Sequence, residues 1–325
     1  MKVAVLAAGS FAVPVLESIV SSRHQLVGLI SRPDRCQGRR HLLAACASAS
    51  WACGAGVPLL KPPRVSDPAF EADFRALGAE TAVVVDFGEI LRPFVFAWAP
   101  QGFFGVHPSM LPRWRGAAPI PWTILAGDAM TGVSIFRLSA SVDTGHLALC
   151  VEAPVETRDT TPTLEDRLGR IGASALLTVL DRIENSMLQL SPQSSDGAIT
   201  ARKLDRSDGL LRWDEAADVL DRRVRALVPW PCARFTARCG EVKVLRAFPI
   251  EGDHQCVPGT VLGTGVTESE GEEGVRVACG RGELLLLELQ SPGKRRLPAS
   301  AWLRGACLPP GSVLEEGRET GDKRT

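Results

Sequence analysis

The chain has 325 residues, which is too long for one ordinary domain and fits about two. Hydrophobic residues make up 45% and charged residues 23%, as in globular proteins, so a globally disordered chain is excluded. The 37 basic residues are balanced by 37 acidic residues. This balance excludes a protein that coats nucleic acid through bulk charge, but it does not exclude local basic patches.

Location and metal content follow from what the sequence lacks. The apolar run at residues 2–6 leads directly into Ala-Ala-Gly rather than into the longer apolar core of a signal peptide. No stretch reaches the roughly 20 apolar residues of a membrane span, so we expect a cytoplasmic protein. The nine cysteines are odd in number, without Cys-x-x-Cys spacing, and the five histidines are scattered. We therefore expect neither a disulfide framework nor a metal site.

The first part of the chain alternates between strand and helix patterns. Residues 81–85 form a continuous apolar run, typical of a strand that is buried on both faces. Asp67 followed by Pro68 predicts the start of a helix that reaches residue 77. The repeated alternation predicts a parallel sheet with helices on both sides. Strands are expected at 2–6, 25–30, 81–85, 103–106 and 132–138, and further helices at 13–20 and 160–190.

A second pattern begins after a polar, turn-rich segment. We expect a first domain over residues 1–190, a linker over 191–206, a second domain over 207–314 and a polar tail over 315–325. Short strands separated by glycine-rich turns favour a small β-barrel. This second domain is expected to contain a helix at 214–227 and strands at 242–247, 257–262, 275–278 and 284–289.

The stretch at residues 105–120 is the densest in unusual residues. A strand pattern ends at His107, and two prolines stiffen the loop that follows. Ligands of open α/β proteins bind at the carboxyl edge of the sheet, where a histidine can exchange protons near neutral pH. Alternatively, His107 simply satisfies its hydrogen bonds at a strand end. Arg113 and Arg115 bind an anion or are solvated loop charges, and spacing alone does not decide.

Asp143 lies in the motif Ser-Val-Asp-Thr-Gly, between two expected strands. Asp-Thr-Gly is a good turn, so the bland interpretation is a hairpin with a capping aspartate. In the functional interpretation the carboxylate orients and electrostatically supports His107. His146 lies three residues further on, but two side chains are too few for a metal site.

Several motifs then resemble a known family, the folate-dependent formyltransferases. The most specific are HPSMLPRWRGAAPIPW at 107–122 and SVDTG at 141–145. Three more resemble that family's amino-terminal domain: FAVPVLE at 11–17, RPDR at 32–35 and VVVDFGEIL at 83–91. Four further motifs resemble the family's carboxy-terminal domain: ARKL at 201–204, DGLLRW at 208–213, VPWP at 228–231 and LQSPGKRR at 289–296. The carboxy-terminal matches favour the branch that acts on aminoacylated tRNA.

The resemblance implies a Rossmann-like catalytic α/β domain with a parallel-rich sheet, followed by an OB-like β-barrel domain that binds tRNA. It also implies formyl transfer from 10-formyltetrahydrofolate, a co-substrate, to the α-amine of methionine on initiator tRNA. The expected enzyme is a monomer that needs no metal. His107 is then the general acid and base, and Asp143 is its partner. Folate is expected at Ser109, Met110, Leu111, Pro112, Phe87, Gly88, Ile90 and Leu91, and tRNA at Arg39, Arg40, Lys294, Arg295 and Arg296.

The sequence departs from the family pattern at three places. Where the family carries asparagine, two residues before the histidine, this chain has Gly105, which has no side chain to stabilise an oxyanion. Loss of one such donor typically costs about 10²–10³ in rate. Residues 7–10 are Ala-Ala-Gly-Ser, where the family usually has Gly-Thr-Pro and an acid. The family's basic tRNA-contacting insertion after Arg40 is cut short.

Positive charge is concentrated locally despite the neutral total. Residues 32–64 carry six basic residues and one acidic residue, and residues 202–246 carry eleven against seven. Such clusters can bind a phosphate backbone. Alternatively, Arg222, Arg223 and Arg225 pair with Asp218 and Asp221 along one helix. Two rival functions stay open: formylation of another amine, on a sugar or nucleotide, and non-catalytic binding of tRNA or folate.

Overall fold

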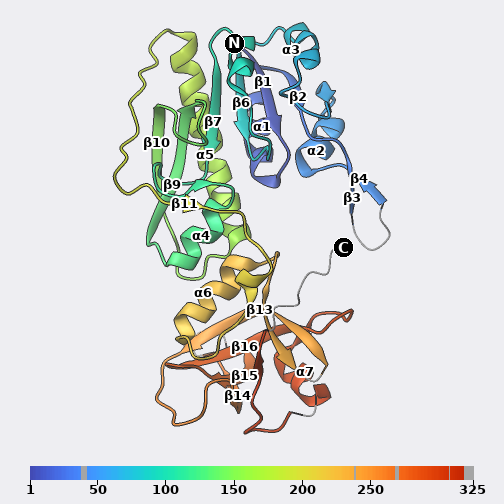
Figure 1. Cartoon of the computed structure of the whole chain (residues 1–325), viewed down its shortest axis with the longest axis vertical. Helices are drawn as coiled ribbons and strands as arrows, with labels where there is room; N and C mark the ends of the chain where they lie inside the picture. The colour runs from blue at the N-terminus through green and yellow to red at the C-terminus, as the bar shows by residue number, and fades with distance from the viewer. Residues whose placement is uncertain (38–41, 238, 268–270, 307, 318–325) are drawn as a thin grey trace. The chain divides into compact units, whose positions relative to one another are not determined.

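The computed structural model describes residues 1–37, 42–237, 239–267, 271–306 and 308–317 (Figure 1). These fall into two compact units. The first comprises residues 1–119, 129–155 and 164–202, and the second comprises residues 120–128, 156–163 and 203–325. The expected fold class is confirmed: an α/β unit with a parallel-rich sheet is joined to a unit built on an antiparallel sheet.

The first unit contains a seven-stranded sheet in the order β10-β9-β7-β6-β1-β2-β5. The five strands from β7 to β5 are parallel, and β9 and β10 are antiparallel to their neighbours. These strands read as apolar runs because helices cover both faces. Their bounds are β1 (Lys2–Ala7), β2 (Gln25–Ile30), β5 (Leu59–Leu60), β6 (Thr81–Val85), β7 (Phe103–His107), β9 (Met130–Arg137) and β10 (Leu147–Pro154).

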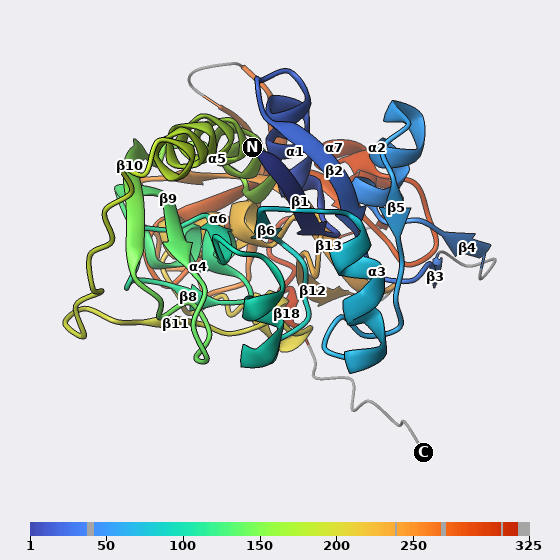
Figure 2. The same ribbon diagram turned by 90° about the horizontal axis from the view of Figure 1, so that it is seen from above.

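Helices α1 (Val13–Val20) and α5 (Thr161–Glu184) lie on one side of the row of strands and α3 (Glu71–Ala76) lies on the other (Figure 2). Gly172 of α5 packs directly on Val106, because its missing side chain allows a close approach. On the opposite face, Phe74 of α3 stacks on Phe103 with ring centroids 5.6 Å apart. Both faces of β7 are therefore covered, and its carboxyl end lies at the edge where ligands of such sheets bind.

Several predicted elements are confirmed within a residue or two. Asp67 caps the turn of 3-10 helix η2 (Pro68–Phe70) that precedes α3, and its carboxylate accepts from the Ala69 amide at 3.0 Å. The helix expected to reach residue 190 ends at Glu184. The remaining elements of the first unit are η1 (Ser10–Ala12), β3 (Arg35–Gln37), β4 (Leu42–Ala44), α2 (Ala47–Ala55), η3 (Pro93–Trp98), β8 (Arg115–Gly116) and β11 (Thr200–Ala201).

The second unit is built on an antiparallel sheet in the order β14-β15-β16-β13-β12-β18, with β17 beside β16. Within its mainly aliphatic core, Phe235 contacts both Trp213 and Trp302, with ring centroids 5.8 Å and 5.9 Å away. No helix in the described residues is both long and apolar enough to cross a membrane. The bounds are α4 (Pro119–Ala126), η4 (Ser207–Gly209), α6 (Ala217–Leu227), β12 (Ala233–Ala237), β13 (Gly240–Ile250), β14 (Val261–Val266), β15 (Glu273–Ala278), β16 (Glu283–Gln290), β17 (Leu297–Pro298), α7 (Ala299–Ala306) and β18 (Glu315–Glu316).

Candidate active site

His107 is the last residue of β7, at the carboxyl edge of the parallel strands, and is only 7% exposed. Its Nε2 lies 2.9 Å from the carbonyl oxygen of Trp114. A carbonyl can only accept, so Nε2 carries a hydrogen and donates it. The ring is thereby fixed by the backbone, and Nδ1 is the nitrogen left to exchange a proton.

Asp143 faces that nitrogen. Its Oδ2 lies 3.7 Å from His107 Nδ1 and accepts a hydrogen bond from the Gly116 amide at 2.8 Å. The aspartate lies between β9 and β10 with a φ of 52°, a left-handed conformation that aspartate tolerates better than most residues. The two catalytic candidates expected from the sequence are therefore brought together, with the carboxylate on the side of the free imidazole nitrogen.

Gln193 holds the Asp143 loop and was missed by sequence reasoning. Its Nε2 donates to the carbonyl oxygens of Asp143 and Gly145, at 2.9 Å and 2.7 Å. Its Oε1 accepts from Nε and Nη2 of Arg115, at 3.1 Å and 2.6 Å. Arg115 is thus engaged with Gln193. The segment expected to be a linker supplies this glutamine and strand β11, which pairs with β8.

The loop after His107 contains the first four residues expected to bind folate. Ser109 is buried and its hydroxyl donates to the Arg113 carbonyl at 2.6 Å. The Leu111 amide donates to Ser134 Oγ at 3.1 Å, and that hydroxyl donates to the Ser109 carbonyl at 2.8 Å. Met110 and Pro112 are partly exposed. Ser134 of β9 therefore holds the loop in shape.

The second group expected to bind folate divides by exposure. Phe87 and Leu91 belong to the apolar core under α3, whereas Gly88 and Ile90 face outward, and Ile90 is 74% exposed. Glu89 anchors this loop, because its carboxylate accepts from the amides of Val65 and Ser66, both at 3.2 Å. The side chains of Phe87 and Leu91 shape the loop from below.

Gly105 lies directly opposite Phe136 in the β7–β9 ladder. A Cβ on Gly105 would lie 2.4 Å from Phe136 Cε1 and 2.6 Å from Cζ. The φ of Gly105 is outside the left-handed range, so the backbone would accept another residue. The phenyl ring therefore fills the volume that a side chain on residue 105 needs.

The residues expected to bind tRNA are only partly described. Arg39 and Arg40 lie outside the described residues, whereas Lys294, Arg295 and Arg296 are exposed in the second unit. The alternative of pairing along one helix is confirmed for Arg222 with Asp218, at 2.9 Å, and Arg225 with Asp221, at 2.7 Å. Arg223 pairs with Glu215 instead. These three arginines are engaged within the protein.

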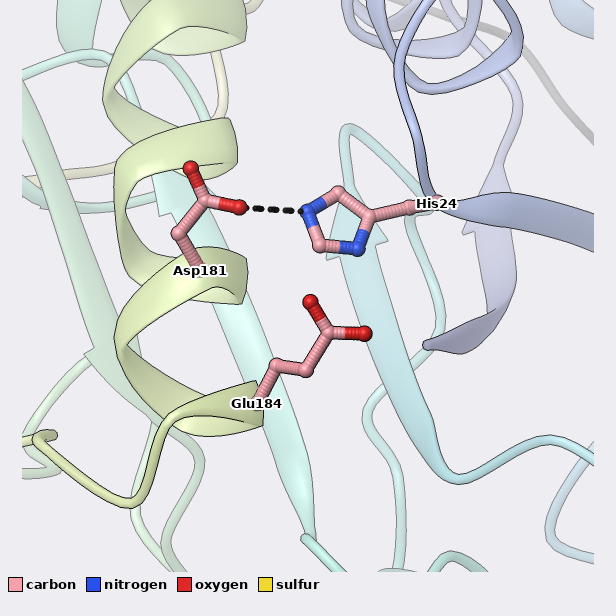
Figure 3. Close-up of side chains that lie close together, drawn as sticks. All are labelled: His24, Asp181 and Glu184. Atoms are coloured by element: carbon pink, nitrogen blue, oxygen red, sulfur yellow. Dashed lines mark hydrogen bonds and ion pairs between the residues drawn. The ribbon is translucent and has the colours of Figure 1, made fainter.

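A second cluster of titratable groups lies at the opposite edge of the sheet, where β2 begins (Figure 3). His24 Nε2 lies 3.1 Å from Asp181 Oδ1, and Glu184 is close by. Arg23 Nη2 pairs with both carboxylates, at 2.7 Å and 2.9 Å. These ion pairs tie the end of α5 to the sheet, at the edge remote from His107.

A cavity of about 340 Å³ lies between the residues after β5 and the start of α3, lined by Lys61, Arg64 and Asp73 among others. None of the residues expected from the sequence to form the site lines it. We locate the candidate site by the His107–Asp143 pair, because a reaction needs the chemical groups as well as a hollow.

Known proteins match this chain over both units. Residues 1–180 match the family model for formyl transferase, and residues 203–306 match that for the formyl transferase C-terminal domain. The chain belongs to the formyltransferase family, and it is an enzyme of that family.

Relatives named methionyl-tRNA formyltransferase align with nearly the whole chain. The protein from Thermus thermophilus is 38% identical over 315 residues, which is 97% of this chain and 99% of the relative. That from Methylobacterium sp. strain 4-46 is 38% identical over 318 residues, covering 97% and 99%. That from Paramagnetospirillum magneticum is 39% identical over 316 residues, covering 97% and 100%.

Solved structures support the fold at lower identity. The sugar 3N-formyl transferase WlaRD, crystallised with dTDP and 5-N-formyl-THF, superposes with a TM-score of 0.64 at 14% identity, covering 91% of this chain and 99% of that one. HypX from Aquifex aeolicus, in complex with tetrahydrofolic acid, gives a TM-score of 0.65 at 16% identity. This match covers 93% of our chain and 47% of HypX.

Proposed function

We propose that this enzyme transfers a formyl group from 10-formyltetrahydrofolate to the α-amine of methionine carried by initiator tRNA. The observation that carries the proposal is the pairing of His107 with Asp143 at the carboxyl edge of the sheet, at 3.7 Å. The identity of 35–39% to methionyl-tRNA formyltransferases, over nearly the full length of both chains, supports this choice of amine over a sugar or nucleotide amine.

The reaction joins the substrate nitrogen to the formyl carbon. The deprotonated amine attacks, a tetrahedral oxyanion forms, and the bond from the formyl carbon to the folate nitrogen breaks as that nitrogen takes up a proton. In our proposal His107 Nδ1 takes the proton that the attacking nitrogen loses once its bond to the formyl carbon has formed, and passes it to the leaving folate nitrogen, since Nε2 is held by the Trp114 carbonyl. Asp143 stabilises the imidazolium that forms, as carboxylates do beside catalytic histidines.

Folate binding is assigned to two loops at the same edge. In the proposal, Ser109, Met110, Leu111 and Pro112 border the reacting end of the folate, and the backbone from Phe87 to Leu91 lines the pterin pocket, at Gly88 and Ile90 in particular. The network from Ser134 and the anchor from Glu89 support this assignment, because they give both loops a fixed shape before a ligand binds. The tRNA, by the same proposal, contacts Arg39, Arg40, Lys294, Arg295 and Arg296. A monomeric enzyme and a cytoplasmic location remain proposals, which sedimentation and cell fractionation test.

A formylation assay on charged initiator tRNA with 10-formyltetrahydrofolate tests the function. The wild type should formylate the tRNA, and His107→Ala should lower turnover by about 10² or more without changing the fold. His146→Ala is the matched control, because His146 is exposed and lies just beyond Asp143. Wild-type protein without activity on this substrate would reject the proposed amine, and an active His107→Ala variant would reject the role of His107.

A further inference from the structure

Asp86 follows β6, the strand next to β7, at the same carboxyl edge of the sheet where His107 ends β7. Val84 of β6 is paired with Gly105 of β7. Two residues further along each chain segment come Asp86, the first residue after β6, and His107, the last residue of β7. Adjacent strands are about 4.8 Å apart, so the two residues leave the sheet side by side. On the other side of Asp86, the amides of Ala8 and Gly9 donate to its carbonyl oxygen, at 3.2 Å and 3.3 Å.

The carboxyl group of Asp86 packs on Gly9. A Cβ on Gly9 would lie only 1.5 Å from Asp86 Oδ2, so only glycine leaves room for the carboxylate there. Asp86 has a φ of 44°, in the left-handed region, and the residue as a whole is exposed. A polar residue held in a rare conformation at the open edge of a sheet is a feature of functional sites.

Charged groups from two other parts of the first unit act on this carboxyl group. Glu165 of α5 lies close, and its Oε1 accepts from Ser10 Oγ at 2.5 Å. Arg32 follows β2. Burial of the carboxyl group against the backbone, together with repulsion by Glu165, raises the pKa of Asp86 to about 6, and Arg32 acts in the opposite direction.

We propose that Asp86 is a second catalytic residue, which binds the ammonium group of the incoming amine and takes its proton. The inference rests on the proposed function. The N–H bond of the ammonium breaks, an O–H bond forms at Asp86, and the nitrogen keeps the electron pair with which it attacks the formyl carbon. The proton then passes from the carboxyl group to water, which reaches this residue because Asp86 as a whole is exposed.

The chemistry of the substrate fits this assignment. An α-amino group has an ordinary pKa of about 7.7–8.0, so most of it arrives protonated at neutral pH. Asp86 and Glu165 carry two negative charges against one from Arg32, which favours a cation at this place. Asp86 then prepares the nucleophile, while His107 remains available to protonate the leaving folate nitrogen.

The pH dependence of kcat/KM with aminoacylated tRNA tests the proposal. In the wild type, protonation of Asp86 should lower kcat/KM as the pH falls through about 6. Asp86→Asn should lower kcat/KM at pH 7.5 by about tenfold to a hundredfold and remove that limb of the profile. Asparagine is the suitable replacement because it also tolerates a positive φ.

Glu165→Gln distinguishes a catalytic from a purely structural role of Asp86. If Asp86 were only structural, this variant would not change the pH at which the limb of the kcat/KM profile falls. Loss of the Glu165 charge should shift the limb to lower pH while the limb itself is retained. Asp166→Asn is the matched control, since it removes a charge one residue away on α5, where Asp166 pairs with Arg170. The control should leave the limb in place.

Failure of the two proposals can be told apart. Wild-type protein without formyl transfer at any pH overturns the proposed function. Active wild type together with an unchanged profile in Asp86→Asn overturns only the role of Asp86. An unshifted limb in Glu165→Gln also overturns it, because the titrating group is then not the one that Glu165 faces.

Discussion

At the scale of single residues, Gly105 and Phe136 depend on each other for space. An oxyanion donor at residue 105 would be expected to raise turnover, but the ring of Phe136 occupies its volume. We expect Gly105→Asn alone to lower stability by about 1–3 kcal/mol, as overpacking does, without raising turnover. Thermal melting and a steady-state assay measure the two effects.

The double variant Gly105→Asn with Phe136→Val, compared with the two single variants, gives a double-mutant cycle for this contact. Valine suits a strand and removes the ring, so the asparagine should fit, and the coupling energy between the two changes should be about 0.5–3 kcal/mol. Turnover should exceed that of Gly105→Asn. Strictly additive stabilities would show that the two residues are independent, and a folded double variant no faster than the wild type would show that another group already stabilises the oxyanion.

The raised pKa of Asp86 also predicts that the stability of the folded protein depends on pH. Folding raises its pKa from 3.8 to about 6, so the folded protein binds more protons than the unfolded chain between these values. Stability from this residue therefore falls as the pH rises through that window. Asp86→Asn should raise Tm at pH 7 and leave it unchanged near pH 3.5, as paired melting curves can test. An equal gain at both pH values would mean that the carboxyl group does not titrate as described.

Residue types and positions in the chain singled out His107 and Asp143 as candidates, because a strand end and an Asp-Thr-Gly turn are local patterns. Their catalytic roles came from the family resemblance, since the pattern alone left a purely structural interpretation open for both. Gln193 and Phe136 could not be found in this way. Gln193 acts through a contact with Asp143, 50 residues earlier in the chain, and Phe136 acts through the shape of its ring beside Gly105. Neither residue has a local signal, since contacts between distant residues are fixed only by the folded chain.

At the scale of elements, the loop between β9 and β10 is held in place by a segment far away in sequence. Gln193→Ala should remove the two hydrogen bonds to this loop and release Arg115, so Asp143 should move relative to His107. We expect kcat to fall by about tenfold to a hundredfold with little change in KM for folate. Gln101→Ala, at an exposed turn before β7, is the control. Wild-type kcat in Gln193→Ala would show that the loop keeps its shape unaided.

Strong periodicity explains which elements were predictable. The apolar run of β6 and the amphipathic helix α1 were located at their observed bounds. Helix α2 (Ala47–Ala55) was not expected, because its alanine, serine and glycine residues give no apolar stripe. Helix α5 ends earlier than expected, because after Glu184 the sequence Asn-Ser-Met continues the apolar pattern only weakly.

At the scale of the whole molecule, the total charge is neutral, so RNA binding depends on which basic side chains are exposed and not engaged in ion pairs within the protein. Asp221 is 2% exposed, and its carboxylate forms ion pairs with both Arg158 and Arg225. These two arginines therefore stabilise the second unit. This sharing joins residues 156–163 to the second unit, which their place in the sequence did not reveal. Lys294 and Arg295 are exposed, and Arg296 lies 4.0 Å from Glu288 with its side chain 70% exposed.

Replacing Lys294, Arg295 and Arg296 together by glutamine should weaken tRNA binding and make its salt dependence shallower by about two in the log–log slope. The measurement is a filter-binding or fluorescence titration at several salt concentrations. Arg75→Gln with Arg170→Gln is the control, because both arginines are exposed on helices of the first unit. Unchanged affinity and slope would move the RNA contacts to another surface.

The contact between Gly105 and the ring of Phe136 also limits how this enzyme can change over time. With glycine at residue 105 there is room for a large residue at 136, but returning to asparagine by single substitutions passes through a less stable intermediate in either order. Restoring the asparagine first meets the ring, and removing the ring first leaves a buried hole, which costs about 3–5 kcal/mol when a phenylalanine becomes alanine. Laboratory evolution that varies one codon at a time should for the same reason recover asparagine at residue 105 less often than a library that varies residues 105 and 136 together.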